Sequence, residues 1–218
     1  MSMVKVSPSI LGVEKDKLTF VCEKLISSGA DLIHFDVMDG EFVSNKSFVD
    51  DEISLVSNFV NKDIIDVHLM CKNLDYYIPL YIKKHVKYIS IHYEAESKED
   101  LINHSKLIKE NHILPGIVIN PETDVSLVLP IIKYFSLVLV MSVHPGMGGQ
   151  KFITASLEKV KALNEFKKAN NLDFQIEVDG GINNENAKIL KECGANILVS
   201  GSYIIKSDDY KKRIKSLK

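Results

Sequence analysis

One apolar run in the sequence carries a histidine and an aspartate at alternate positions. His34 and Asp36 lie within residues 32–38, just ahead of the turn-forming pair Asp39-Gly40. Alternate side chains of a strand point to the same face, so both would face one side of a half-buried strand. They are unfavourable there unless they are paired or bind a metal ion. The run therefore predicts a chemically active site inside the fold.

His68 and Asp179 complete a set of metal-ligand residue types with these two. Two imidazoles and two carboxylates suit Zn²⁺, Fe²⁺, Mn²⁺ or Co²⁺. The two negative charges would also balance a divalent cation inside the protein. A buried hydrogen-bonded network without a metal is the alternative interpretation.

The elements that must position these side chains alternate along the chain. Between the strand-like runs lie segments with apolar residues at three- and four-residue spacing, which predict helices. Eight strand-then-helix units in a chain of this length are typical of a (β/α)₈ TIM barrel in the α/β class. A doubly wound sheet fits less well, because the GxGxxG fingerprint is missing after the first strand. The strand-like runs cover residues 4–11, 32–38, 64–70, 86–93, 113–120, 137–143, 174–179 and 197–202.

Polar residues gather where these strands end, which is where barrel enzymes place their chemistry. In ring order, the second and third strands are neighbours, whereas the seventh lies three steps from the second in the other direction. Asp36 and Asp179 would therefore face each other across a bound molecule. The strand-end polar residues are Ser9, His34, Asp36, Asp66, His68, Ser90, His92, Asn120, Glu177 and Asp179.

Composition restricts the class of protein. The chain has 218 residues, is 45% hydrophobic and carries a formal net charge of −2. This length fits one large domain or, less easily, two small ones, and the eight units without a linker favour one domain spanning residues 1–218. The charge gives no electrostatic reason to expect a nucleic acid or membrane partner. No run reaches the ~20 apolar residues of a membrane span. The three cysteines show no metal-binding or disulfide spacing, so we expect a reducing, cytoplasmic location.

Glycines cluster in three of the expected loops. Gly146, Gly148 and Gly149 follow the sixth strand, Gly180-Gly181 the seventh, and Gly201-Ser202 the eighth. Glycine lets backbone N–H groups converge on an anion, and a helix N-terminus adds a favourable dipole. Each group alone could be a plain tight turn. Three on adjacent loops predict a phosphate-binding site.

Six motifs, taken in order, resemble the ribulose-phosphate 3-epimerase family over nearly the whole chain. The resemblance implies a (β/α)₈ barrel of the ribulose-phosphate-binding type, one catalytic divalent metal that is usually zinc or iron, and a homo-oligomer. The motifs are Ser7-Pro8-Ser9-Ile10-Leu11, His34-Phe35-Asp36-Val37-Met38-Asp39-Gly40, Asp66-Val67-His68-Leu69-Met70, Met141-Ser142-Val143-His144-Pro145-Gly146-Met147-Gly148-Gly149-Gln150, Glu177-Val178-Asp179-Gly180-Gly181 and Ser200-Gly201-Ser202.

The resemblance also implies roles for residues. His34, Asp36, His68 and Asp179 would bind the metal, and Asp36 and Asp179 would be the acid/base pair. The implied reaction epimerises D-ribulose 5-phosphate to D-xylulose 5-phosphate at C3, with one carboxylate on each face of the substrate. The metal would stabilise the enediolate between the two proton transfers. Implied substrate contacts are Ser9, His68, Gly146, Met147, Gly148, Gly149, Asp179, Gly180, Gly181, Gly201 and Ser202.

Three positions depart from the family pattern and leave the substrate open. Glu41 and Ser44 stand where the family usually has histidine and proline, and Met147 where phenylalanine is common. These loop positions bear on sugar preference and loop closure. An epimerase acting on D-allulose 6-phosphate is one alternative, although the intact glycine motifs favour the pentose.

Two further alternatives belong to other function classes. The first is a metal-independent phosphate-binding barrel lyase, similar to orotidine-phosphate decarboxylase. That chemistry requires a lysine among the strand-end carboxylates, and the strand-end motifs contain none. The second is a non-catalytic barrel that binds a phosphorylated ligand. The four potential metal ligands argue against it, because buried polar groups destabilise a fold in which they have no function.

Overall fold

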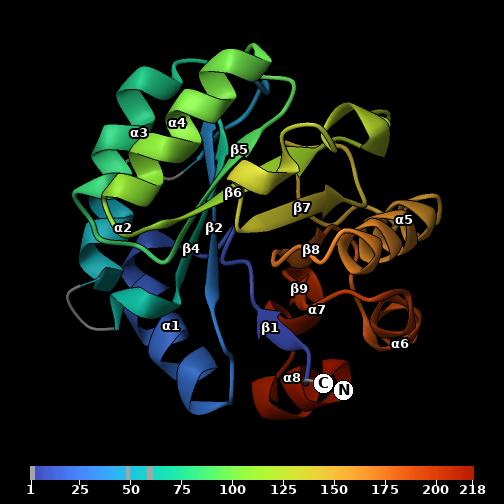
Figure 1. The fold of residues 1–218 in the computed structure, drawn as a ribbon. Helices are drawn as coiled ribbons and strands as arrows, with labels where there is room; N and C mark the ends of the chain where they lie inside the picture. The colour runs from blue at the N-terminus through green and yellow to red at the C-terminus, as the bar shows by residue number, and fades with distance from the viewer. Residues whose placement is uncertain (1–2, 48–49, 58–60) are drawn as a thin grey trace.

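Eight parallel strands form a ring in the computed structural model, which describes residues 3–47, 50–57 and 61–218 (Figure 1). Within the described residues the strand order is β1-β9-β8-β7-β6-β5-β4-β2. The ring is completed between β1 and β2 by a bridge from Ser9 to His34. There the His34 N–H donates to the Pro8 carbonyl at 3.0 Å. The strands are β1 (Lys5–Ser7), β2 (Ile33–Asp39), β4 (Ile65–Met70), β5 (Tyr88–His92), β6 (Leu114–Ile119), β7 (Leu137–Met141), β8 (Gln175–Asp179) and β9 (Ile197–Val199).

The predicted barrel and all eight predicted strands are confirmed, although β7 and β9 end at Met141 and Val199 instead of residues 143 and 202. The first strand ends at Ser7 instead of residue 11, because Pro8 has no N–H to continue the ladder and Ser9 contributes only its single bridge. A short strand β3 (Lys46–Ser47) was not predicted and pairs antiparallel with the end of β2.

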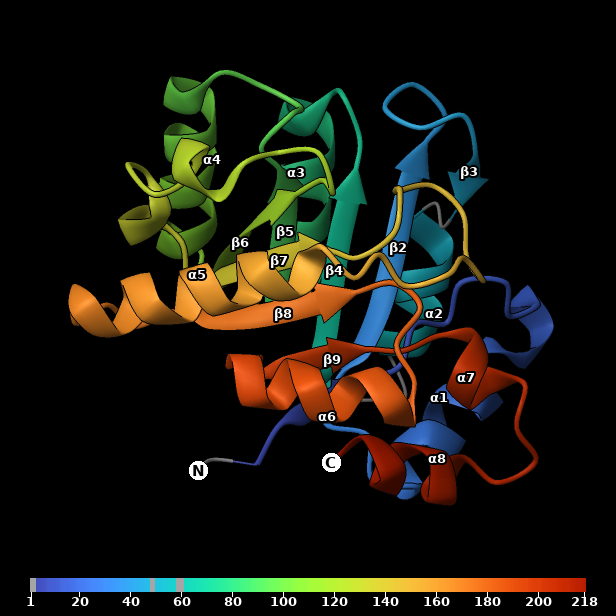
Figure 2. The ribbon, with the colours of Figure 1, turned by 90° about the vertical axis from the view of Figure 1, so that its right-hand side faces the viewer.

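Helices cover the outside of the ring (Figures 1 and 2). Leu18, Val21, Cys22 and Leu25, apolar residues at three- and four-residue spacing, are buried along α1. Gly194 ends α6 in the left-handed conformation, with φ 111°, as glycine does at many helix ends. The helices are α1 (Leu18–Ser27), α2 (Asp50–Ser57), α3 (Leu74–Ile82), α4 (Lys98–Glu110), α5 (Ser156–Ala169), α6 (Asn184–Cys193), α7 (Ser202–Ile205) and α8 (Tyr210–Leu217).

The fifth strand-then-helix unit differs from the sequence-based expectation, because its helix is missing. Between β6 and β7 the chain, fully described here, forms two 3₁₀ turns, η3 (Val125–Leu127) and η4 (Ile132–Tyr134), and no α-helix. Pro121 and Pro130 lie in this segment. Proline removes a helix hydrogen bond and clashes with the preceding turn, which explains the short turns.

The inside of the ring is filled partly by apolar and partly by polar side chains. Tyr88, Leu139 and Ile197 belong to an apolar cluster there. Asp66, Ser90 and Glu177, expected at the mouth, are instead fully buried. Gly116 makes room for Ser90, since a Cβ there would lie 2.2 Å from Ser90 Oγ. Of the predicted rim residues, Ser9, Asp36 and Asp179 line the cavity at the mouth, whereas Asp66, Ser90 and Glu177 do not.

Two further observations bear on the expected cellular setting. Among the described residues, no helix combines the length and apolar character needed to cross a bilayer. Cys22, Cys71 and Cys193 are all free thiols.

Candidate metal and active site

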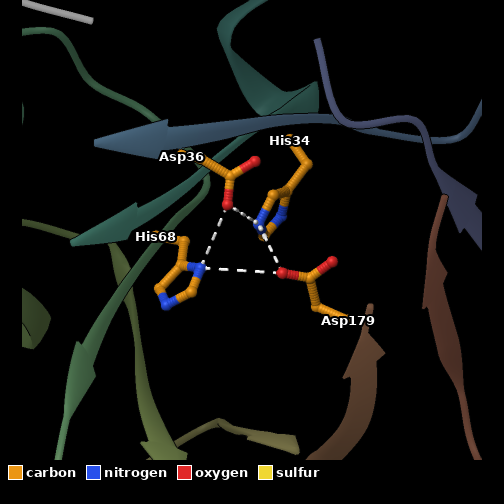
Figure 3. Close-up of side chains that lie close together, drawn as sticks. All are labelled: His34, Asp36, His68 and Asp179. Carbon is orange, nitrogen blue, oxygen red and sulfur yellow. Dashed lines mark ion pairs between the residues drawn. The ribbon is translucent and has the colours of Figure 1, made fainter. Parts of the chain in front are cut away.

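Four side chains converge at the carboxyl ends of three strands (Figure 3). His34 and Asp36 come from β2, His68 from β4, and Asp179 from β8 on the opposite side. Asp36 Oδ1 lies 3.5 Å from His34 Nε2 and 3.3 Å from His68 Nδ1. Asp179 Oδ2 lies 4.0 Å and 3.9 Å from the same two nitrogens. The four residues predicted as a set are brought together, with the two carboxylates facing each other.

This cluster fits a divalent metal. His34 Nε2 and His68 Nδ1 are buried and have no hydrogen-bond partner, although buried nitrogens normally have one. The four ligand atoms lie within 4.8 Å of one another. Ligands about 2.0–2.1 Å from a tetrahedral ion are about 3.4 Å apart, close to the shorter contacts of Asp36. Two imidazole nitrogens and two carboxylate oxygens are also a donor set that such ions prefer.

The position of His34 is fixed from behind. Its Nδ1 lies 2.7 Å from Asp66 Oδ2, which also accepts a hydrogen bond from Ser7 Oγ at 3.1 Å. The carboxylate therefore holds the Nδ1–H and leaves Nε2 directed at the cluster. A carboxylate behind a histidine is a common support for a metal ligand.

His68 is supported by a longer chain of contacts. Its Nε2 lies 2.8 Å from His92 Nε2, and His92 Nδ1 lies 3.1 Å from Glu94 Oε2. Sequence reasoning placed His92 among the strand-end residues but missed Glu94. The signal was present, because Ser90, His92 and Glu94 continue one alternating face past the end of β5.

The two opposed carboxylates have different proton affinities. Burial raises the pKa of Asp36, but the charge of His34 and the close contacts with His34 and His68 outweigh burial and hold it well below its usual range. Burial raises the pKa of Asp179 to about 7, and the negative charge of Asp36 adds to the increase. Ser9 Oγ donates to Asp36 Oδ2 at 2.7 Å and further stabilises the charged form. Before any metal binds, one carboxylate is therefore ionised and the other titrates near neutral pH.

The two histidines also differ. Burial lowers the pKa of His34, but the charges of Asp66 and Asp36 outweigh it and raise the pKa well above the usual value. Burial lowers the pKa of His68 to about 4, so this ring is neutral. The cause of the difference is the carboxylate in contact with His34, since His68 has His92 in the same place.

A cavity of about 340 Å³ opens beside the cluster. Met38, Met70 and Met141 supply apolar lining close to the two carboxylates. His68 is fully buried and lies outside the lining. Every other predicted substrate contact lines the cavity: Ser9, Gly146, Met147, Gly148, Gly149, Asp179, Gly180, Gly181, Gly201 and Ser202.

The glycine loops require glycine for conformational and steric reasons. Gly181 has φ +64°, and a Cβ there would lie 2.6 Å from the Phe152 amide nitrogen. The backbone can therefore approach closely only without a side chain. Lys206 is the only lysine or arginine among the described residues of the lining. It was missed by sequence reasoning, because nothing in the short segment after Ser202 marks it.

The loop that departs from the family pattern lies over this mouth. Asn45 Nδ2 donates to the Gly146 carbonyl at 2.8 Å, and Gly146 lies close to Val43. In Figure 2 the segment after β7 passes beside the carboxyl end of β2. Glu41, Ser44 and Met147 thus belong to two loops in contact, and Met147 is 61% exposed.

Comparison with known proteins gives a consistent result. Residues 5–205 match the sequence profile of the "Ribulose-phosphate 3 epimerase family". A ribulose-phosphate 3-epimerase from Bacillus subtilis is 39% identical over 217 residues, which cover 99% of each chain. The enzyme of the same name from Escherichia coli is 34% identical over 218 residues, covering 100% of this chain and 96% of the other.

Solved structures with lower identity share the fold. A 3-keto-L-gulonate-6-phosphate decarboxylase from Vibrio cholerae has a TM-score of 0.70 at 11% identity, covering 98% of this chain and 95% of the other. A 3-hexulose-6-phosphate synthase from Salmonella typhimurium has a TM-score of 0.70 at 12% identity, covering 98% and 96%. At such identities the likeness concerns the barrel alone.

Proposed function

Because the chain belongs to the ribulose-phosphate 3-epimerase family, we propose that it interconverts D-ribulose 5-phosphate and D-xylulose 5-phosphate. The reaction inverts C3, and a divalent metal would be held by His34, Asp36, His68 and Asp179. One observation carries the mechanism: two carboxylates with different proton affinities face each other at one end of the cavity. Inversion of a carbon next to a ketone needs such a pair.

Each carboxylate serves one face of the substrate. In one direction Asp36 takes the proton from C3. The electron pair of the C–H bond forms the C2=C3 double bond, and the π pair of the C2 carbonyl moves onto oxygen to give an enediolate. Asp179 then delivers its own proton to the opposite face of C3. In the reverse direction the two residues exchange roles. One turnover leaves Asp36 protonated and Asp179 ionised, and the starting state is restored by a turnover in the opposite direction or by proton exchange with water. The enediolate therefore does not have to rotate inside the cavity.

The neighbouring residues prepare this exchange. Ser9 donates to the Asp36 oxygen that points away from His34 and His68, and so orients the carboxylate. Met38, Met70 and Met141, each at most 5% exposed, keep water from the carbon that loses its proton. When bound, the metal would supply a positive charge that stabilises developing negative charge on substrate oxygens.

The glycine loops would hold the phosphate. Gly180, Gly181, Gly201 and Lys206 all line the cavity, so their backbone N–H groups and the ammonium group are candidates for this contact. Such groups bind a phosphate without a side chain, and a lysine adds a point charge. The volume of about 340 Å³ is at the small end of ligand pockets and suits a phosphorylated pentose.

A coupled assay of the purified, metal-loaded protein tests the proposal. We expect kcat/KM for D-ribulose 5-phosphate to exceed that for D-allulose 6-phosphate, and elemental analysis to find one divalent metal per chain. Removal of the metal by a chelator should abolish activity, and added metal should restore it. A higher kcat/KM for the hexose phosphate would assign the protein to the allulose branch. Full activity in metal-free protein would refute the metal site.

A further inference from the structure

Glu94 lies outside the metal-ligand cluster but is joined to it through two rings. His68, a ligand of the proposed metal site, contacts His92 at 2.8 Å between their Nε2 atoms. His92 contacts Glu94 at 3.1 Å between Nδ1 and Oε2. Both rings are 0% exposed, so neither can exchange these partners for water. The contacts thus lead from the Glu94 carboxylate through the imidazoles of His92 and His68 to the metal-ligand cluster.

These contacts determine where each proton lies. A carboxylate only accepts hydrogen bonds, so His92 must carry its proton on Nδ1 and donate it to Glu94. Neutral His92 then has a bare Nε2, which accepts from His68 Nε2–H. Neutral His68 in turn has a bare Nδ1, the nitrogen that faces Asp36 and Asp179. A metal binds an imidazole nitrogen only through such a free lone pair.

The carboxylate itself is held in place on its other side. Glu94 Oε1 accepts from the Asn120 N–H at 2.9 Å and from Thr123 Oγ1. Lys159 Nζ binds the carbonyls of Asn120 and Thr123 at 2.8 and 2.6 Å. The loop after β6 therefore keeps Glu94 Oε2 directed at His92.

The rings are fixed as well. His68 and His92 are stacked, with centroids 4.9 Å apart and an angle of 28° between planes. The ring centroid of Phe42 lies 4.6 Å from that of His92. Rotation of either ring would break these contacts, so the route from Glu94 to His68 is a rigid one.

We propose that Glu94 is a positioning residue: acting through His92, it holds His68 in the tautomer whose bare Nδ1 can bind a divalent metal. This inference rests on the metal site of the proposed function. Glu94 itself touches neither substrate nor metal.

Glu94→Gln is the informative substitution, because the loop decides how the amide must lie. Its single carbonyl oxygen is required by the two donors from Asn120 and Thr123. The NH₂ group then faces His92 Nδ1, which must accept. His92 donates from Nε2, His68 accepts on Nε2, and neutral His68 carries its proton on Nδ1, where the metal should bind.

Nitrogen-15 NMR of the imidazole side chains in metal-free protein reads these tautomers without metal or activity. We expect His68 to carry its proton on Nε2 in the wild type and on Nδ1 in Glu94→Gln. In the same proteins, the dissociation constant for Zn²⁺, measured by competition with a chelating dye, should rise roughly 10- to 100-fold. Glu94→Ala, which offers neither acceptor nor donor, should give a mixture of tautomers and a smaller loss of affinity.

Glu96→Gln is the matched control. Glu96 lies two residues further along the same loop and contacts His104 Nδ1 at 2.9 Å, outside the metal-ligand cluster. The same chemical change there should leave the His68 tautomer and the Zn²⁺ dissociation constant unchanged. An unchanged His68 tautomer in Glu94→Gln would overturn the positioning role, whatever the metal affinity. Wild-type protein with the expected tautomers but no Zn²⁺ binding would instead overturn the metal site of the proposed function.

Discussion

Replacing either opposed carboxylate by its amide should separate removal of the proton from inversion. Asp36 and Asp179 are the only carboxylates among the described residues of the cavity lining. Glu177, the next acid along β8, is fully buried below the cluster. No other group can take over, so Asp179→Asn should lose the full contribution of an acid/base residue. That contribution is about 10²–10⁴-fold in kcat, or about 2.7–5.5 kcal/mol of activation free energy.

The sharper readout is exchange of the C3 hydrogen with solvent in deuterated water. In Asp179→Asn, Asp36 still faces the substrate and removes the C3 proton of one epimer. With no partner on the other face, it returns a deuteron to the same face. We expect that epimer to gain deuterium without forming product, while the other epimer stays unlabelled. Asp36→Asn should show the opposite preference.

Metal content measured beside each exchange experiment separates loss of the acid/base group from loss of a ligand. An amide oxygen can still bind a metal, so both variants should retain it at saturating concentration. The double variant should be hardly slower than either single one, because each single change already stops inversion. If both variants label the same epimer, or if Asp179→Asn inverts C3 at the wild-type rate, the two-face mechanism is refuted.

Three other perturbations have expected outcomes. Without a metal, the pKa of His34 is well above its usual value and that of Asp179 is about 7, so binding of Zn²⁺ must displace protons from both. The affinity for Zn²⁺ should therefore rise with pH from about 5 to 8. Titration calorimetry in buffers of different ionisation enthalpy should detect the released protons. Burial, with the Asp66 charge next, raises the pKa of Glu177, so the native state retains a proton that the unfolded state loses above its pKa of about 4.3. Above that pH, the free energy of unfolding of the wild type should fall relative to that of Glu177→Gln by about 1.4 kcal/mol per pH unit, up to the pKa of Glu177 in the folded state. Urea unfolding that gives the same difference in stability between the two proteins at every pH would contradict this. Lys206→Gln should raise KM about two- to fivefold at low salt with kcat unchanged, and the effect should shrink in steady-state assays at high salt.

The positions of the four cluster residues followed from strand alternation and ring order alone. Alternation places His34 and Asp36 on one face, and β8 lies three steps from β2 by way of β1 and β9. What alternation does not contain is depth along the barrel axis, which depends on the stagger between strands. For that reason Asp66 and Glu177 were expected at the mouth but lie below it.

The fifth connection shows a second limit. Val128, Ile131, Ile132 and Phe135 have the spacing of a helix face, and all four are buried. The spacing of apolar residues here thus corresponds to burial without corresponding to a helix. Pro130, inside this run, prevents the helical hydrogen bonds that the same spacing usually accompanies. The loop after β6 that results is the one that supports Glu94, a relation between distant segments that no local pattern contains.

The junction between β1 and β2 also bears on how the protein is made. β1 emerges first from the ribosome, yet its ladder partner β9 begins at Ile197. At the same junction Ser9 bridges to His34 and bonds to Asp36, while Asp179 arrives only with β8. Partial chains that end before β8 thus contain His34 and His68 but lack Asp179. Because long-range pairing of this kind is slow to form, we expect the four cluster side chains to come together late in folding, once β8 has joined the ring.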